Sequence, residues 1–245
     1  MLRKVISISL ICLFLIGIMS CAVPAPPGPS SPAPSPTTEV KIIENSLRFY
    51  RRSVATMPPS FQTDLCGEIQ NTGSEWVTSI SLIAKFYDER GYLLQECYAS
   101  PFHAYLPFPP GEKSPFVFAS FPTPGSLNYF PYSNYTLEVS YSIATPFVYS
   151  AKIEILNVEL KITKSSYLKI EVHNAGTGRG GAFLLVTFYD DQGGVLSFGD
   201  TGTSLLLPNQ VETVELRPYA GLESGYGVYA VSNNYSLRVV YNPSY

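Results

Sequence analysis

A hexapeptide that occurs twice gives the strongest constraint on how this chain folds. FYDERG at residues 86–91 returns as FYDDQG at residues 188–193, 102 positions later. Three more segments recur in the same order, namely GEIQNTG (67–73) with IEVHNAG (170–176), PGE (110–112) with PNQ (208–210) and NYTLEVSY (134–141) with NYSLRVVY (234–241). This ordered series predicts two successive copies of one structural unit, with the boundary near residues 145–150.

Both copies have the pattern of β structure. Apolar residues alternate with polar or small ones along 79–86, 135–142 and 235–241, which is typical of half-buried strands. Asn-x-Gly and Asp-x-x-Gly segments separate these runs, and Asn and Gly favour turns because they tolerate positive φ. About six short strands per copy favour an antiparallel sandwich. We therefore predict an all-β chain with two tandem antiparallel Ig-like β-sandwich domains, residues 39–147 and 148–245, in which Phe86 and Phe188 fill equivalent core positions.

The repeated landmarks resemble a known family. The x-G-x-[IV]-x-N-x-G strand, the [FL]-Y-D-x-x-G hairpin, the P-G-E turn and the last alternating strand are similar to the FxLYD family of extracytoplasmic domains and to CARDB-type adhesion modules. The first copy fits this pattern, whereas the second has Ile170 in place of Gly and Asn209-Gln210 in place of Gly-Glu. The resemblance implies Ig-like sandwiches of envelope proteins and carries no common activity.

The N-terminus predicts the cellular location. Two basic residues precede Val5–Ser20, an uncharged run of 16 residues, which is shorter than the roughly 20 residues of a spanning helix and typical of a secretory signal. The run ends in Ile-Met-Ser-Cys, which resembles a prokaryotic lipobox. The resemblance implies that residues 1–20 are a signal peptide and that Cys21 becomes the lipidated N-terminus of a protein on the extracytoplasmic face of the cell membrane. An ordinary signal or an uncleaved anchor with an incidental cysteine is the alternative.

Residues 21–38 are expected to be the lipidated cysteine and a disordered linker. Seven of the seventeen residues in 22–38 are proline. Such a segment cannot pack a core and favours the polyproline II conformation, in which it reaches roughly 50 Å. A lipid, a stiff spacer and a folded region together indicate a surface lipoprotein.

The charge of the chain argues against a nucleic-acid partner. The formal net charge is −3, and removal of the first 20 residues takes away Arg3 and Lys4 and no acid, which leaves about −5. A nucleic-acid-binding domain carries a basic surface instead.

Two cysteines remain in the predicted folded region. Cys66 and Cys97 both lie in the first copy, and their counterparts in the second copy are Lys169 and Gly199. Joint presence in one copy and joint absence in the other favour a disulfide in an oxidising compartment, on the polar faces of two strands. Free thiols and a metal site are the alternatives.

No motif predicts catalysis. The two histidines, His103 and His173, have no nucleophile elbow nearby. The carboxylates in the Asp-x-x-Gly turns lack the spacing of a calcium loop, and GTGRGG (176–181) lacks the Lys-Ser/Thr of a phosphate loop. We expect no catalytic residue, no metal site and no cofactor, and hence a protein that is not an enzyme.

The loops before the last strands are the best candidates for binding. Residues 121–135 and 217–235 are rich in aromatic residues at equivalent places in the two copies. Exposed aromatic side chains mark binding patches, and the candidates are Tyr129, Phe130, Tyr132, Tyr226 and Tyr229. Alternatively, these rings cap the ends of the sandwiches or join the two copies.

The sequence thus predicts a membrane-anchored lipoprotein that serves as a binding, adhesion or spacer module. Its partners are expected to be the membrane, through the N-terminal lipid, and an envelope protein or glycan. The alternatives are an accessory subunit of an envelope complex or transporter and, on weaker grounds, a secreted hydrolase.

The lipidation site gives a direct test. Cys21→Ser is expected to abolish acylation and either to release the protein or to leave an unprocessed precursor, because the acyl group needs this thiol. Fatty-acid labelling in cells and membrane fractionation measure both effects. Unchanged labelling and membrane retention of the variant would refute Cys21 as the site.

Overall fold

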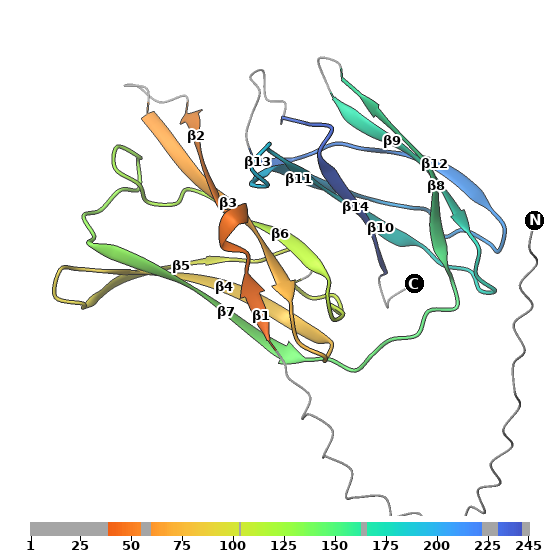
Figure 1. The fold of residues 1–245 in the computed structure, drawn as a ribbon, viewed down its shortest axis with the longest axis horizontal. Helices are drawn as coiled ribbons and strands as arrows, with labels where there is room; N and C mark the ends of the chain where they lie inside the picture. The colour runs from red at the N-terminus through yellow and green to blue at the C-terminus, as the bar shows by residue number, and fades with distance from the viewer. Residues whose placement is uncertain (1–38, 55–59, 103, 163–165, 222–229, 242–245) are drawn as a thin grey trace, which may run out of the picture. The chain divides into compact units, whose positions relative to one another are not determined.

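The structure is a computed structural model that describes residues 39–54, 60–102, 104–162, 166–221 and 230–241 (Figure 1). These residues belong to one compact unit, Pro36–Tyr245. The predicted signal peptide, Cys21 and the predicted linker lie outside the described residues, and so do His103, Tyr226 and Tyr229. Among the described residues, no helix is long and apolar enough to cross a membrane.

Strands make up nearly all of the regular structure in the described residues. The exception is η1 (Glu44–Ser46), a single turn of 3-10 helix. The strands of the first sandwich are β1 (Val40–Ile42), β2 (Arg48–Val54), β3 (Ser60–Asn71), β4 (Val77–Tyr87), β5 (Leu93–Ala99), β6 (Lys113–Phe118) and β7 (Asn134–Ile143). Those of the second are β8 (Ile153–Lys161), β9 (Tyr167–Asn174), β10 (Ala182–Tyr189), β11 (Val195–Gly202), β12 (Val211–Leu216), β13 (Ala220–Gly221) and β14 (Tyr235–Tyr241).

The two sandwiches share one strand order, and all described pairings are antiparallel. In the first, β1 and β2 follow each other along one edge of β3 and β6 lies along the other edge, while β5, β4 and β7 form the second sheet. In the second, β8-β9-β12 and β11-β10-β14 repeat this order, with β13 added outside β11. The prediction of an all-β, sandwich-type fold is confirmed (Figure 1).

Each sandwich has its own hydrophobic core between its two sheets. Phe86 and Phe188 are fully buried at the centres of these cores. Phe86 lies opposite Tyr135, and Phe188 lies opposite Tyr235. A β-bulge follows each of the two phenylalanines. The predicted equivalence of the two positions is therefore confirmed by burial and by register.

The Asp-x-x-Gly segments close equivalent hairpins. The Asp190 carboxylate accepts hydrogen bonds from the backbone N–H groups of Gln192 and Gly194 at 2.9 and 2.7 Å, and Asp88 makes the same pair of bonds in the first sandwich. Gly193 has φ +79°, the left-handed conformation that Gly adopts without strain. The predicted turn chemistry is confirmed.

A buried asparagine ties each sandwich together. Asn174 donates hydrogen bonds to the carbonyls of Gly178 and Leu206 at 2.9 and 3.0 Å and accepts bonds from the backbone N–H groups of Gly176 and Lys152. Asn71 makes the corresponding bonds to two carbonyls and to one N–H group in the first sandwich. One side chain thus satisfies backbone groups of several segments where no water reaches.

The turn before β6, and its counterpart before β12, bonds to the backbone of this asparagine and explains one departure from the family pattern. Gly111 donates its N–H to the Asn71 carbonyl at 2.8 Å, and Asn209 donates to the Asn174 carbonyl at 2.8 Å. Gly111 has φ +80° and Asn209 has φ +65°. Because Asn tolerates the left-handed region better than most residues do, PNQ can replace PGE without a change of fold.

The predicted disulfide is not formed, because both cysteines are free thiols. Cys66 lies on the outer face of its sheet and packs in a cluster with Val195 and Phe198 of the second sandwich. Cys97 lies on the inner face of the other sheet of the first sandwich and packs against its core. The two thiols therefore point in directions that no disulfide joins, and Cys97 is not on the polar face that was expected.

The buried asparagine yields a stability prediction. Asn174→Ala leaves two backbone carbonyls and two N–H groups without their partner and is expected to lower the free energy of unfolding by about 3 kcal/mol. Thr177→Ala, at an exposed position of the same turn, is the control and is expected to change it by less than about 0.5 kcal/mol. Urea unfolding followed by circular dichroism measures both variants, and equal losses would contradict the role given to Asn174.

Candidate functional site

The two sandwiches pack through the outer faces of one sheet each. Cys66 of β3 forms a buried cluster with Val195 and Phe198 of β11. Tyr50, Val117 and Tyr189 pack around this cluster. Apolar side chains on an outward strand face are otherwise exposed to water, so their burial stabilises the contact. Burial raises the pKa of the Cys66 thiol to about 12, and the protonated group acts as a small apolar side chain.

Polar groups at the edge of this cluster fix the contact. Arg48 makes a two-bond pair with Asp190, with Nε···Oδ2 at 2.6 Å and Nη2···Oδ1 at 3.1 Å. The hydrogen bond from Arg48 lowers the pKa of Asp190. Tyr50 donates its hydroxyl to the Val195 carbonyl at 2.5 Å. A Cβ at Gly194 would lie 2.0 Å from Arg48 Cζ, so a larger residue there would displace the guanidinium from the carboxylate.

A buried carboxylate lies at the same contact. Glu68 is 1% exposed, and Tyr189 donates its hydroxyl to Glu68 Oε1 at 2.8 Å. Burial raises the pKa of Glu68, although the bond from Tyr189 and the charges of Lys113 and Arg238 act in the opposite direction. Burial likewise raises the pKa of Tyr189. The two side chains therefore share a desolvated hydrogen bond between the sandwiches.

A polar pocket of about 290 Å³ adjoins Tyr189. Its walls come from the turn before β6, from the start of β6 and from β10 and β14. The residues are Gly111, Glu112, Lys113, Tyr189, Ser236 and Arg238. Arg238 Nη1 donates to Glu112 Oε2 at 2.7 Å. Arg238 Nη2 is shielded from solvent and has no hydrogen-bond partner among the described residues. The pocket thus carries donors of two cationic side chains.

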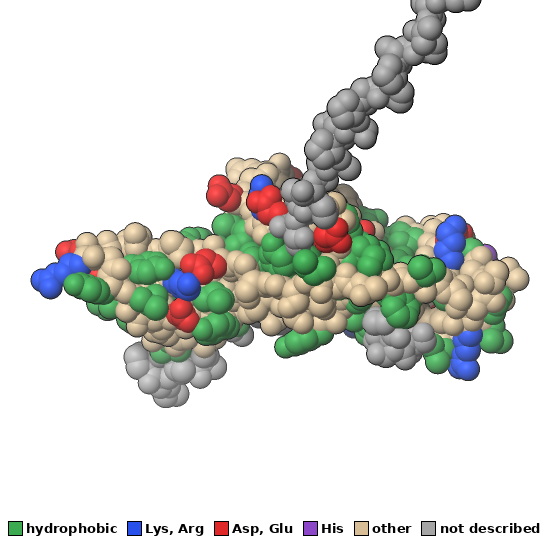
Figure 2. Space-filling model, turned by 90° about the horizontal axis from the view of Figure 1, so that it is seen from below, with side chains coloured by type: hydrophobic (Ala, Val, Ile, Leu, Met, Phe, Trp, Pro, Cys, Tyr) green, Lys and Arg blue, Asp and Glu red, His purple; other side chains and the backbone are tan. Residues whose placement is uncertain are grey.

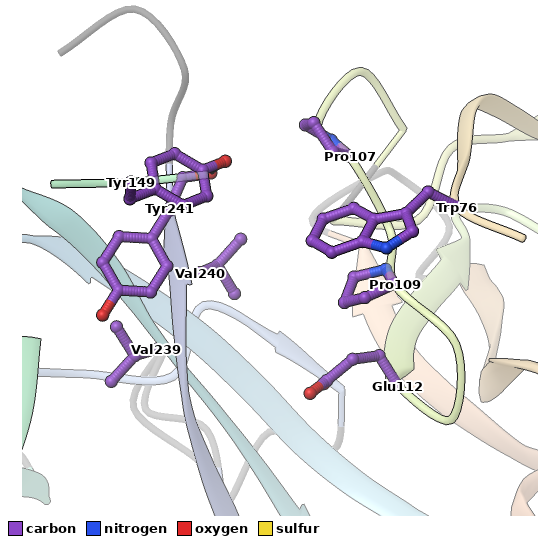
Figure 3. A pocket seen from close by; sticks show the side chains of 8 residues that line it. All are labelled: Trp76, Pro107, Pro109, Glu112, Tyr149, Val239, Val240 and Tyr241. Carbon is purple, nitrogen blue, oxygen red and sulfur yellow. Dashed lines mark hydrogen bonds between the residues drawn. The ribbon is translucent and has the colours of Figure 1, made fainter. Parts of the chain in front are cut away.

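An aromatic cleft of about 60 Å³ shares Glu112 with this pocket (Figure 3). On one side, Trp76 stands with Pro107 and Pro109 of the first sandwich, as Figure 3 shows. On the other side, Tyr149 stacks on Tyr241 with a ring-centroid distance of 4.5 Å, and Val239 and Val240 complete the wall. Aromatic walls with a few polar groups are the usual lining of a small-ligand site.

Another hollow lies along the side of the first sandwich. Its volume is about 600 Å³, and its lining residues are Val40, Lys41, Ile42, Glu44, Leu47, Tyr135, Leu137 and Val139. It is larger than the cleft, but its walls come from one sandwich and it brings together one acid and one base at most. The cleft and the polar pocket together are therefore the candidate site.

The aromatic loop candidates of the first copy divide into two kinds. Phe130 and Tyr132 fold back onto Phe86, with ring-centroid distances of 5.3 and 4.9 Å, and Tyr132 donates its hydroxyl to the Pro122 carbonyl. Tyr129 is 42% exposed. Two of the three rings thus cap the end of the sandwich, which is the alternative reading of this loop. Tyr226 and Tyr229 lie outside the described residues.

Sequence reasoning did not select the residues of the candidate site. By the local offsets of the repeat, Trp76, Lys113 and Arg238 correspond to Arg179, Val211 and Glu138. These differences between the two copies were the one feature of the sequence that could have indicated the three residues. A position that has a role in only one copy need not resemble its counterpart in the other. The same signal marked Cys66.

The structure gives no metal centre in the part of the chain that it describes: no three His, Cys, Asp or Glu side chains there form a group that could hold a metal ion. His173 lies on β9 opposite Val211. In comparisons with known proteins, no family model matches the chain and no curated protein matches it. The resemblance to the FxLYD family stays a prediction.

The raised pKa of Glu68 predicts a pH dependence. The folded protein holds a proton that the unfolded chain releases first, so the free energy of unfolding falls as the pH rises from the ordinary glutamate value through the raised pKa. Glu68→Gln removes this titration and is expected to gain stability relative to the wild type as the pH rises through that window. Urea unfolding at a series of pH values up to neutrality measures the difference.

A second variant tests the hydrogen bond that limits this shift in the pKa of Glu68. Tyr189→Phe removes a hydrogen bond that lowers the pKa of Glu68, so the fall in stability is expected to move to higher pH. Parallel pH profiles of the wild type and Glu68→Gln would contradict the assignment.

Proposed function

We propose that the protein is a lipid-anchored module of the cell envelope that binds a ligand in the cleft between its two sandwiches. The observation that carries this proposal is the convergence of Trp76 from one sandwich with Tyr149 and Tyr241 from the other. The ion pair between Arg48 and Asp190 supports it, because it holds the two walls in a fixed relation.

The N-terminal features suit this role. A lipid on Cys21 would hold the protein at the membrane, and the proline-rich residues 22–38 would let the folded part stand up to roughly 50 Å away. A binding site for an envelope protein or a glycan benefits from such a distance, because the ligand then reaches it without contact with lipid head groups.

One observation favours a second candidate, an accessory subunit of an envelope complex or transporter. The edge strand β5 pairs only with β4 among the described strands, and its Leu93 and Tyr98 are 50% and 64% exposed. The equivalent strand β11 is covered by β13 on that side. An unpaired apolar edge accepts an extended segment of another protein. Hydrophobic side chains also form separate groups on the face in Figure 2.

Two variants separate these candidates. Trp76→Ala is expected to abolish capture of the partner by the mature protein in its own membranes, because it removes one wall of the cleft. Tyr98→Ala removes an exposed ring from β5 and is expected to leave capture unchanged. Crosslinking in intact cells, purification and mass spectrometry of retained proteins and saccharides measure the outcome. Loss with Tyr98→Ala alone would favour the subunit, and loss with neither variant would contradict both sites.

A further inference from the structure

We propose that the polar pocket binds the carboxylate of a ligand whose body lies in the aromatic cleft. The inference rests on the proposed function and names the chemical class of its ligand. The pocket and the cleft share Glu112 and lie next to each other along β14, since Arg238 lines the first and Val239, Val240 and Tyr241 line the second.

The cationic side chains near the pocket have more hydrogen-bond donors than the neighbouring carboxylates accept. Of the two carboxylates, Glu112 is paired with Arg238 Nη1 at 2.7 Å, and Glu68 accepts the hydroxyl of Tyr189 at 2.8 Å. The Lys113 ammonium makes no ion pair within the described part of the chain. The cationic side chains therefore have hydrogen-bonding capacity that the acids near them do not use.

Of the two cationic side chains, Arg238 gives the stronger evidence for an anionic ligand. Its Nη2 is shielded from water and has no partner in the described residues. Buried donors are rarely left without an acceptor, and a charged donor loses more free energy in that state than a neutral one. A carboxylate supplies two acceptor oxygens and a compensating charge. Because Nη2 has almost no accessible surface, the guanidinium has to turn toward the pocket before the two groups pair in one plane.

The size of the site limits the ligand. The polar pocket of about 290 Å³ and the cleft of about 60 Å³ together provide about 350 Å³, which lies at the lower end of the range for small-molecule sites, roughly 300 to 1,000 Å³. This volume suits a single charged group and the ring or side chain that bears it. The cleft beyond Glu112 presents Trp76, Tyr149 and Tyr241 to the apolar part of such a ligand.

Two sources of carboxylate have this chemistry, an acidic saccharide and the C-terminal residue of a peptide. Trp76 is the only tryptophan of the chain, so its fluorescence reports on the cleft. The mature protein is titrated with D-glucuronic acid, with N-acetylphenylalanine and, as the neutral control, with D-glucose. A saturable change of Trp76 fluorescence with at least one acid and none with glucose is expected, and the acid that binds identifies the source.

Two lysine variants test which positive charge binds the carboxylate. Lys113→Gln removes a cation that holds no partner in the described fold, and it is expected to raise the Kd of the bound acid about tenfold, the loss of one hydrogen bond to a charged group. Lys169→Gln removes an exposed lysine from β9 and is the matched control, with no change expected. Added salt is expected to weaken binding in the wild type.

Three results would overturn the inference: no response to either acid, an equal response to glucose, or equal effects of the two lysine variants. If Trp76→Ala abolishes capture of the membrane partner while neither acid binds, the carboxylate site fails and the proposed function stands.

Discussion

Two sheets, one from each sandwich, pack together through their outer faces, and this contact buries Cys66, Val195 and Phe198. This contact differs from the cores of the sandwiches, which form between sheets of the same copy. It places Arg48 against Asp190 and Tyr189 against Glu68, and it forms the cleft and the polar pocket at its margin. The candidate site therefore depends on the contact, since neither sandwich holds both walls.

Most of the internal structure of each copy could be predicted from the sequence. The Asp-x-x-Gly turns, the buried phenylalanines and the alternating strands follow from local rules on φ, period and turn residues, and those rules act within a few residues of the chain. Repetition strengthened them, because each pattern occurred twice. The replacement of Gly111 by Asn209 kept the same left-handed turn, so even a departure from the pattern had a local reason.

The relation between the copies was beyond these rules. The pattern around Cys66 placed it with polar residues, and in sequence terms an outward position suggested solvent or a disulfide. The structure puts it against the second sandwich, which no local pattern describes. Trp76, Lys113 and Arg238 were missed for the same reason: their places in the candidate site arise where a surface of one copy meets a surface of the other. Only the differences between the copies pointed to them.

The outer-face contact also has a consequence for self-association. In the first sandwich, Arg48, Cys66 and Val117 form a row across the sheet, and the same row in the second sandwich is Glu159, Lys169 and Glu215. The other surface of the contact is the outer face of β11, and β5 is its counterpart in the first sandwich. There Glu96 occupies the position that Phe198 has in β11. A further copy would have to bury these charges to repeat the contact. The docking surfaces match once, inside a single chain, and the charges at their counterparts disfavour repetition of the contact between chains.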